Sequence, residues 1–171
     1  MNKCVFLDRD GVLNEEIGRY VWQVCDFEIR PGIIDLLKFF KSKGYLLIVI
    51  TNQGGIARGM YTHEDVKKCH DHFQKECGNL IDAFYYSPYQ NSFSASLGAK
   101  PGTLLFERAI AKYNIDPTAS WMIGDKDRDI LPATKLGIKT IRLITKDEEQ
   151  EPRIADFTLQ ALKEVKEVIL N

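Results

Sequence analysis

The chain has 171 residues, of which 44% are hydrophobic and 27% are charged, so it can bury a core and lacks the composition of a disordered protein. Lys and Arg number 23 against 24 Asp and Glu, and the net charge of −1 is not the positive field expected of a general nucleic-acid binder. The longest continuous apolar run, 45–50, is too short to cross a bilayer, and the charges at 8–10 interrupt the N-terminal apolar stretch before a secretory signal could form.

Cysteine usage favours a reducing compartment. The four cysteines are scattered, without a Cys-x-x-Cys pair or a histidine at ligand spacing: Cys4, Cys25, Cys69 and Cys77. We therefore expect reduced thiols in a cytoplasmic protein.

Short β-rich runs alternate with amphipathic helical patterns along the whole chain. In chain order we expect a strand at 5–7, an irregular segment at 12–31, a helix from 33 closed by Gly44, a strand at 46–50, a helix at 62–78, a strand at 83–86, a loop at 87–100, a helix at 101–110, a strand at 121–123, a helix at 127–136, a strand at 138–143, a short strand at 155–158 and a C-terminal helix from about 159. Thr62 and Asp65 resemble a capping box, and Pro132 is expected in the first turn of its helix.

This alternation predicts an α/β fold with a doubly wound parallel sheet, helices on both faces and a single domain over 1–171. In such sheets ligands bind beyond the carboxyl ends of the strands. That rule selects a small set of residues as candidates: Asp8, Asp10, Thr51, Asn52, Gly124, Asp125 and Asp129.

Carboxylates gather at two of these strand ends. Asp8 and Asp10 are one residue apart, and converging carboxylates repel each other unless a cation lies between them. Mg²⁺ is the usual oxygen-bound divalent ion beside phosphates. Asp125 supplies a third carboxylate from a separate strand, which disfavours the alternative that all three are turn or capping residues.

The segment 51–55, Thr-Asn-Gln-Gly-Gly, follows the second strand directly. Its hydroxyl, its amides and its backbone N–H groups can surround an anion, and its glycines permit close approach. A plain loop is the alternative interpretation.

Three ordered motifs resemble the haloacid dehalogenase (HAD) superfamily of phosphohydrolases over nearly the whole chain. They are FLDRDGVLN at 6–14, ITNQ at 50–53 and GDKDRD at 124–129. The segment ITNQGGIARGMY at 50–61 is most similar to the branch that contains the D-glycero-D-manno-heptose 1,7-bisphosphate 7-phosphatases and the histidinol-phosphatases. The resemblance implies a HAD-like, Rossmann-like fold.

The resemblance also implies roles for the strand-end residues. Asp8 would be the nucleophile that forms an aspartyl-phosphate, and Asp10 the general acid and base. Mg²⁺ would be held by Asp8, the backbone carbonyl of Asp10, and Asp125. Thr51 and Asn52 would bind the phosphoryl oxygens, and the catalytic set would include Thr51.

Further contacts follow from the same resemblance. Asp129 would help to order the Mg²⁺ site without being a ligand. Substrate contacts would come from two segments, near 16–20 and over 51–54: Glu16, Tyr20, Thr51, Asn52, Gln53 and Gly54.

The spacing of the motifs leaves no room for the lid domain that members of this family often carry. From Asp10 to Thr51 there is room for a flap, one helix and one strand, and from Thr51 to Lys100 for one helix, one strand and a loop. Neither gap holds a lid of about 60 residues, near the lower size of a domain. We therefore expect a capless fold with an open site, whose selectivity comes from loops or a partner subunit.

The chain departs from the heptose bisphosphate branch where that branch carries a zinc loop with Cys-x-His and Cys-x-Cys. The corresponding positions hold hydroxyl side chains, which are poor Zn²⁺ ligands: Ser87, Tyr89, Ser94 and Ser96. We therefore expect no structural zinc.

A second departure concerns the phosphate-binding lysine of the branch motif Arg-Lys-Pro-x-Pro-Gly. An alignment without gaps from 101–102 puts the arginine of that motif on Leu97 and its lysine on Gly98. Lys100, the only nearby cation, either serves as the catalytic lysine from a shifted backbone or is a solvent-exposed lysine. In the second case Lys126 is the first alternative source of the cation.

The sequence thus favours a Mg²⁺-dependent phosphatase of a small phosphorylated metabolite, foremost a sugar (heptose) bisphosphate. Histidinol phosphate is the alternative substrate, and a non-catalytic phosphosugar- or partner-binding domain is the alternative class. A non-catalytic binding domain has no need of both a nucleophile and an acid, so the presence of Asp8, Asp10 and Asp125 disfavours that class. We expect a monomer or small homo-oligomer that binds a small molecule and neither nucleic acid nor membrane.

Overall fold

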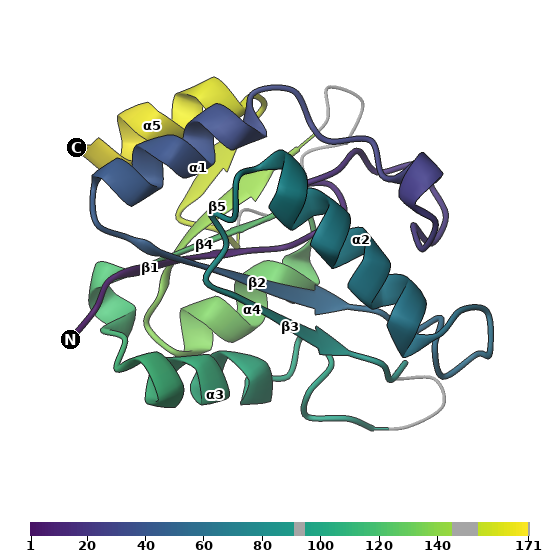
Figure 1. Ribbon diagram of the computed structural model, residues 1–171. Helices are drawn as coiled ribbons and strands as arrows, with labels where there is room; N and C mark the ends of the chain where they lie inside the picture. The colour runs from purple at the N-terminus through teal and green to yellow at the C-terminus, as the bar shows by residue number, and fades with distance from the viewer. Residues whose placement is uncertain (91–94, 145–153, 171) are drawn as a thin grey trace.

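A parallel β-sheet forms the centre of the fold. The structure is a computed structural model that describes residues 1–90, 95–144 and 154–170. The sheet order is β3-β2-β1-β4-β5-β6, with the bounds β1 Cys4–Leu7, β2 Leu46–Asn52, β3 Ala83–Ser87, β4 Trp121–Gly124, β5 Lys139–Leu143 and β6 Phe157–Leu159. All neighbouring strands are parallel, which confirms the predicted doubly wound α/β architecture (Figure 1).

Helices cover both faces of this sheet. They are α1 Ile33–Ser42, α2 His63–Glu76, α3 Leu104–Tyr113, α4 Asp127–Lys135 and α5 Leu162–Leu170, with 3₁₀ turns η1 Val24–Asp26 and η2 Pro117–Ala119. Figure 1 shows α1, α2 and α5 on one side of the sheet and α3 and α4 on the other. No helix in the described ranges has the length and apolar composition needed to span a bilayer.

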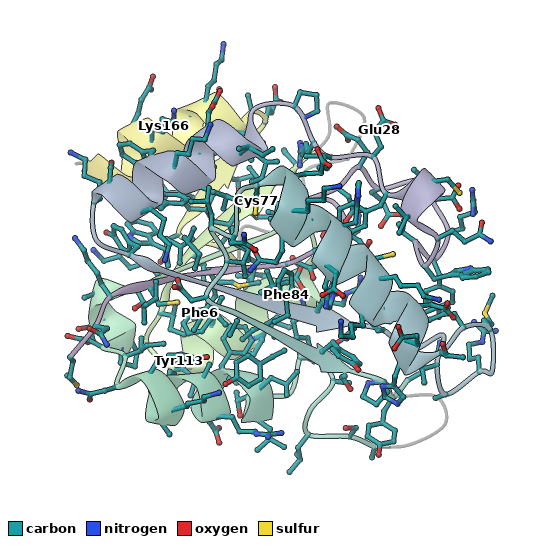
Figure 2. All side chains as sticks on the ribbon, viewed as in Figure 1. Phe6, Glu28, Cys77, Phe84, Tyr113 and Lys166 are labelled. Carbon is teal, nitrogen blue, oxygen red and sulfur yellow. The ribbon has the colours of Figure 1, made fainter. Side chains whose placement is uncertain are left out.

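The core consists of two layers because both faces of the sheet are buried. Along β1, Val5 and Leu7 pack towards α1, α2 and α5, whereas Phe6 packs towards α3 and α4 (Figure 2). Phe6 meets Phe106 of α3 with ring centroids 5.3 Å apart. Strand side chains alternate between faces, so a strand buried on both sides reads as a continuous apolar run.

The capping box predicted for α2 is present. The Asp65 carboxylate accepts from the backbone N–H of Thr62 at 2.9 Å, and the Thr62 hydroxyl accepts from the backbone N–H of Asp65 at 3.3 Å. This reciprocal pair satisfies backbone donors that the first turn of a helix leaves without partners.

Helix α3 begins later than predicted. It starts at Leu104 rather than Pro101, because the preceding segment forms a turn in which the N–H of Gly102 donates to the carbonyl of Ala99 at 2.8 Å. A Cβ on Gly102 would lie 2.2 Å from the carbonyl oxygen of Leu97, so the turn is too tight for a side chain there.

Other details also differ from the predictions. Helix α4 starts at Asp127 as predicted, but Pro132 lies in its second turn rather than in its first, and the helix ends at Lys135. Strand β6 and helix α5 begin at Phe157 and Leu162, each a few residues after the predicted starts. Strand β2 extends through Asn52, so the first three residues of the second motif lie in the strand and Gln53 directly follows it.

The described chain has no lid domain. Between β1 and β2 it contains only the first motif, a flap over 15–32 that includes η1, and then α1. Between β2 and α3 it contains α2, β3 and loops. The carboxyl ends of the central strands therefore open directly to the surface, as the capless prediction requires.

Candidate active site

The candidate site lies at the carboxyl ends of the three central strands, β2, β1 and β4. Asp8 follows β1, Thr51 lies at the end of β2, and Asp125 follows β4. The backbone N–H of Asp8 donates to the carbonyl of Ile123 at 3.0 Å, which extends the pairing of β1 and β4 by one residue. The sheet thus brings together side chains that are more than 40 residues apart in the sequence.

Three carboxylates crowd together at this edge. Asp8, Asp125 and Asp129 are all buried, and one oxygen of each lies within 4.8 Å of the other two. Burial, followed by repulsion from Asp8 and Asp129, raises the pKa of Asp125 to about 7. Burial and the charge of Asp8 also raise the pKa of Asp129.

The crowding fits a bound divalent cation. The Oδ1 atom of Asp125 is buried and has no hydrogen-bond partner within the described part of the chain. A buried carboxylate oxygen without a partner is costly, and a hard cation with oxygen ligands would satisfy it. Gly11 leaves room for this carboxylate, because a Cβ at this position would lie 2.6 Å from the Cγ of Asp125. Its φ of +85° is also a backbone conformation that favours glycine.

Lys100 lies inside the site. Its ammonium is 2.8 Å from Oδ1 of Asp8 and 2.6 Å from Oδ1 of Asp129, and it donates to the carbonyl of Ile50 at 2.6 Å. Burial disfavours the charged form, but attraction to Asp129 and Asp8 outweighs it and raises the pKa of Lys100. With 2% of its surface exposed, Lys100 is not the solvent-exposed lysine that the sequence left as an alternative.

The backbone of Lys100 is clamped by Asn52. The side-chain amide of Asn52 accepts from the Lys100 N–H at 2.8 Å and donates to the Lys100 carbonyl at 2.9 Å. The alignment without gaps had put the lysine on Gly98, but the turn before α3 brings Lys100 to Asp8 instead. With Lys100 as the lysine of the branch motif, Ala99 stands where that motif has its arginine.

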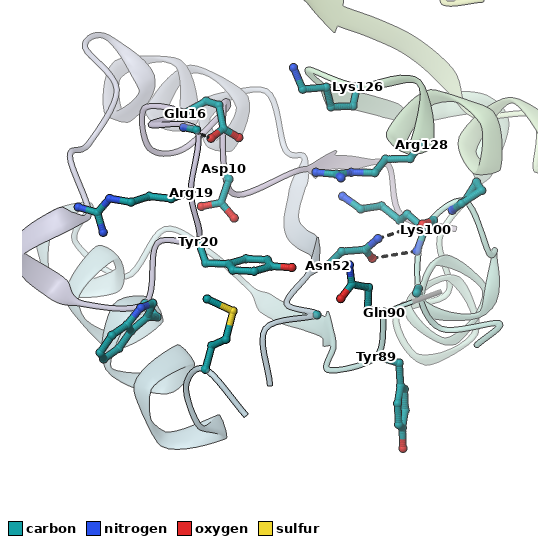
Figure 3. A pocket seen from close by; sticks show the side chains of 16 residues that line it. Asp10, Glu16, Arg19, Tyr20, Asn52, Tyr89, Gln90, Lys100, Lys126 and Arg128 are labelled. Atoms are coloured by element: carbon teal, nitrogen blue, oxygen red, sulfur yellow. Dashed lines mark hydrogen bonds between the residues drawn. The ribbon is translucent and has the colours of Figure 1, made fainter. Parts of the chain in front are cut away.

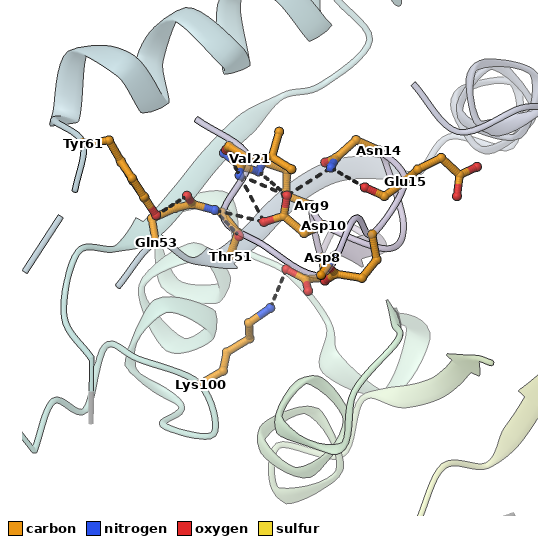
Figure 4. A network of polar contacts seen from close by, with 12 residues as sticks. Asp8, Arg9, Asp10, Asn14, Glu15, Val21, Thr51, Gln53, Tyr61 and Lys100 are labelled. Atoms are coloured by element: carbon orange, nitrogen blue, oxygen red, sulfur yellow. Dashed lines mark hydrogen bonds and ion pairs between the residues drawn. The ribbon is translucent and has the colours of Figure 1, made fainter. Parts of the chain in front are cut away.

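Asp10 lies outside the carboxylate cluster. Its carboxylate accepts from the guanidinium of Arg9 at 3.0 to 3.2 Å, from Nδ2 of Asn14 at 3.0 Å and from Nε2 of Gln53 at 3.2 Å (Figure 4). Arg9 is itself buried and also donates to the carbonyl of Val21 at 2.5 Å. These contacts hold the Asp10 carboxylate in place at the edge of the cavity.

A cavity of about 1080 Å³ opens above these groups. Figure 3 shows Asp10, Glu16 and Tyr20 on one side and the side chains of Lys100 and Arg128 extending from the other. The lining includes Asp10, Glu16, Arg19, Tyr20, Trp22, Asn52, Gly54, Gln90, Lys100, Lys126 and Arg128. One side of the cavity therefore has two carboxylates and an aromatic ring together with Arg19, whereas the other side has the cations Lys100 and Arg128.

Most of the substrate-contact residues expected from the sequence line this cavity. Glu16, Tyr20, Asn52 and Gly54 do so, whereas the side chains of Thr51 and Gln53 are buried beneath it. Thr51 Oγ1 accepts from Nε2 of Gln53 at 3.0 Å.

Sequence reasoning missed other lining residues. Arg128 was not singled out, although it follows the metal-ligand candidate Asp125 within one helical turn, and Trp22 lies in the flap that carried no motif. Lys126 appeared only as an alternative to Lys100; it lies on the cavity wall, 3.4 Å from Asp125.

The positions that would carry a zinc loop have other contacts. The Oγ of Ser87 accepts from the N–H of Tyr89 at 3.4 Å, and the Oγ of Ser96 accepts from the N–H of Gly98 at 3.2 Å. Ser94 lies outside the described residues. The expected lack of structural zinc stays a prediction.

Comparisons with known proteins agree on the family. Residues 98–165 match the HAD-hydrolase-like family model. A D-glycero-beta-D-manno-heptose-1,7-bisphosphate 7-phosphatase of Haemophilus ducreyi is 39% identical over 83% of this chain and 82% of its own length. The alpha-anomer counterpart of Campylobacter jejuni is 34% identical over 98% of this chain and 94% of its own. The crystal structure of a D,D-heptose 1,7-bisphosphate phosphatase from B. bronchiseptica, complexed with magnesium and phosphate, has a TM-score of 0.87 at 22% identity and covers 98% of both chains.

Proposed function

The chain belongs to the family of HAD-like phosphatases, and we propose that residues 1–171 act as one domain that removes the 7-phosphate of a heptose 1,7-bisphosphate in a Mg²⁺-dependent reaction. Relatives named as heptose-1,7-bisphosphate 7-phosphatases match 83% of the chain for the beta anomer and 98% for the alpha anomer. The observation that carries the proposal is the cavity itself, because its lining includes Lys100, whose ammonium lies 2.8 Å from the buried carboxylate of Asp8, and further cations that suit a second phosphate.

In the proposed mechanism the Asp8 carboxylate attacks phosphorus and forms an aspartyl-phosphate, while Asp10 protonates the leaving sugar oxygen. Asp10 then removes a proton from the water that hydrolyses this intermediate. The contacts of Asp10 with Arg9, Asn14 and Gln53 support the role, since they fix its carboxylate beside the cavity rather than in the metal cluster.

Phosphoryl transfer depends mainly on positioning and charge stabilisation, and this chain has groups for both. Lys100 would stabilise the transferring oxygens, with the hydroxyl of Thr51 and the amide of Asn52 as further hydrogen-bonding groups. Asp8, Asp125 and the carbonyl of Asp10 would hold Mg²⁺, which supplies charge neutralisation when bound. Asp129 would orient the site through Lys100.

Arg128 supports a substrate with a second phosphate. It is exposed, lines the cavity and, within the described ranges, has no hydrogen-bond or ion-pair partner. Desolvation disfavours the charged guanidinium, but attraction to Asp129, Asp8 and Asp125 outweighs it and raises the pKa of Arg128, so the guanidinium stays charged. A guanidinium without a partner in a cavity is suited to a second phosphate, which histidinol phosphate lacks.

Substrate panels test the proposed function. Phosphate release should be fastest with heptose 1,7-bisphosphate, slower with histidinol phosphate and nucleotides, and lost without Mg²⁺. A faster reaction with histidinol phosphate, or full activity in a metal chelator, would overturn the substrate or the metal assignment respectively.

The variant Arg128→Ala should lower kcat/KM for heptose 1,7-bisphosphate about 10- to 100-fold, the range of charge-assisted hydrogen bonds. The same variant should change kcat/KM for heptose 7-phosphate little, because the second phosphate is missing there. Arg19→Ala is the matched control, since Arg19 lines the same cavity but is paired with Asp26 at 2.8 Å. Equal losses on both substrates would place Arg128 at the transferred phosphoryl group instead.

The variant Asp125→Asn should remove the stabilisation that Mg²⁺ gives to the folded protein. In the wild type, Mg²⁺ at about 100 times its dissociation constant should add about 2.7 kcal/mol and raise Tm. Without metal, Asp125→Asn should be at least as stable as the wild type, because it relieves repulsion from Asp8 and Asp129. Asp71→Asn, at an exposed position on α2, is the control, and an unchanged Mg²⁺ response of Asp125→Asn would contradict the assignment.

A further inference from the structure

Tyr61 is a buried residue to which the proposed mechanism gives no role. It follows the second motif in the chain, only 5% of its surface is exposed, and its hydroxyl donates to Oε1 of Gln53 at 2.9 Å. The other end of the same amide, Nε2 of Gln53, donates to Oδ2 of Asp10 at 3.2 Å and to Oγ1 of Thr51 at 3.0 Å. Figure 4 shows this line of contacts from Tyr61 through Gln53 to Asp10.

The orientation of the Gln53 amide decides whether it supports or opposes Asp10. The two ends of an amide have almost the same shape but opposite polarity. In the observed orientation the NH₂ group donates to the carboxylate, whereas a flipped amide would place its oxygen against a carboxylate oxygen. Since Gln53 is 1% exposed, water cannot compensate for the wrong orientation.

Tyr61 selects the supporting orientation. Burial raises the pKa of Tyr61 to about 12, so its hydroxyl keeps its proton. Within the described residues, Oε1 of Gln53 is the hydrogen-bond acceptor of this hydroxyl. A flipped Gln53 would turn its NH₂ group towards the hydroxyl and leave the hydroxyl proton without that acceptor.

The ring of Tyr61 is held from two sides. A Cβ on Gly55 would lie 2.1 Å from Cε1 of Tyr61, so the loop packs directly on the ring. From the flap, Tyr20 meets the ring edge-on with centroids 5.7 Å apart, and Trp22 stacks on it at 6.3 Å. The hydroxyl therefore has little freedom to leave Gln53.

We propose that Tyr61 is a positioning residue for the acid-base step: it fixes the Gln53 amide so that its NH₂ group holds the carboxylate of Asp10 against the leaving oxygen. This inference rests on the proposed role of Asp10 as general acid. It also assigns Gln53 a place between Tyr61 and Asp10 rather than at the substrate.

The first test compares leaving groups. In single-turnover measurements Tyr61→Phe should slow phosphorylation by a sugar phosphate about 3- to 10-fold, the worth of one neutral hydrogen bond. It should slow phosphorylation by 4-nitrophenyl phosphate less, because nitrophenolate leaves without a proton. Tyr45→Phe, which removes a hydroxyl outside the cavity, should change neither rate.

The second test asks whether Tyr61 acts through Gln53. The double variant Tyr61→Phe with Gln53→Ala should be as slow as Gln53→Ala alone, because the first change has nothing left to orient. Additive losses, or equal slowing of both leaving groups by Tyr61→Phe, would overturn the proposal.

A third measurement is independent of turnover. NMR of the Gln53 side-chain amide should show slow hydrogen exchange in the wild type and faster exchange in Tyr61→Phe. Unchanged exchange would refute the positioning role even if the wild type were inactive, whereas an inactive wild type with the expected exchange would refute only the proposed function.

Discussion

Asp8→Asn is expected to abolish phosphate release, with a loss on the order of 10⁶-fold, the size seen when a covalent hydrolase loses its nucleophile. An amide of nearly the same shape cannot form the acyl phosphate. The substitution can keep the hydrogen bond from Lys100, because the amide oxygen can accept at the 2.8 Å position of the carboxylate oxygen. The fold should therefore survive while the chemistry is lost.

Two measurements separate these effects. Phosphate release from the sugar phosphate reports the chemistry, and Tm reports the fold; the control is Asp35→Asn, an exposed position on α1 that should leave both unchanged. Borohydride reduction during turnover should convert position 8 of the wild type to homoserine, which mass spectrometry detects. Substantial turnover by a folded Asp8→Asn protein would refute the assignment of the nucleophile.

The sheet and its edge residues could be predicted because they depend on local pattern. A strand buried on both faces is a short apolar run, and β1 and β4 end where Asp8 and Asp125 follow. Once the strands are parallel, their carboxyl ends meet at one edge. The convergence of these acids, although distant in sequence, therefore follows from the alternation of strands and helices.

The position of Lys100 could not be derived in the same way. It depends on a tight turn before α3 and on the two hydrogen bonds with Asn52, a residue 48 positions earlier. Counting without gaps cannot detect such a turn, so the alignment put the lysine on Gly98. The same turn delayed the start of α3 beyond Pro101.

The residues of the cavity wall could not be predicted from the sequence for a related reason. Arg128 and Trp22 belong to segments without a strand-end signal, and only the folded chain shows that both line one cavity. The family resemblance implied that Gln53 touches substrate. The alternation of side chains along an extended backbone instead buries its amide between Tyr61 and Asp10.

Lys100→Met should reduce turnover of both a sugar phosphate and 4-nitrophenyl phosphate about 10²- to 10³-fold, the usual effect of removing one electrostatic contact to a transition state. The loss should be similar for the two substrates, because the ammonium would act on the transferring phosphoryl group whatever the leaving group. Asp10→Asn should instead affect the sugar phosphate more strongly in single turnover. This contrast would assign Lys100 to charge stabilisation and Asp10 to proton transfer.

The variant Lys100→Met should also destabilise the protein. Lys100 neutralises Asp8 and Asp129, all three being almost fully buried, and removing one partner of a buried ion pair typically costs about 3 to 5 kcal/mol. Methionine retains the apolar stem, so the loss of Tm isolates the charge, and Mg²⁺ should restore part of it by neutralising the carboxylates. Lys163→Ala, at an exposed position on α5, is the control. Near-full activity of Lys100→Met on both substrates would move the catalytic cation elsewhere, and Lys126→Ala would then be the variant that loses activity.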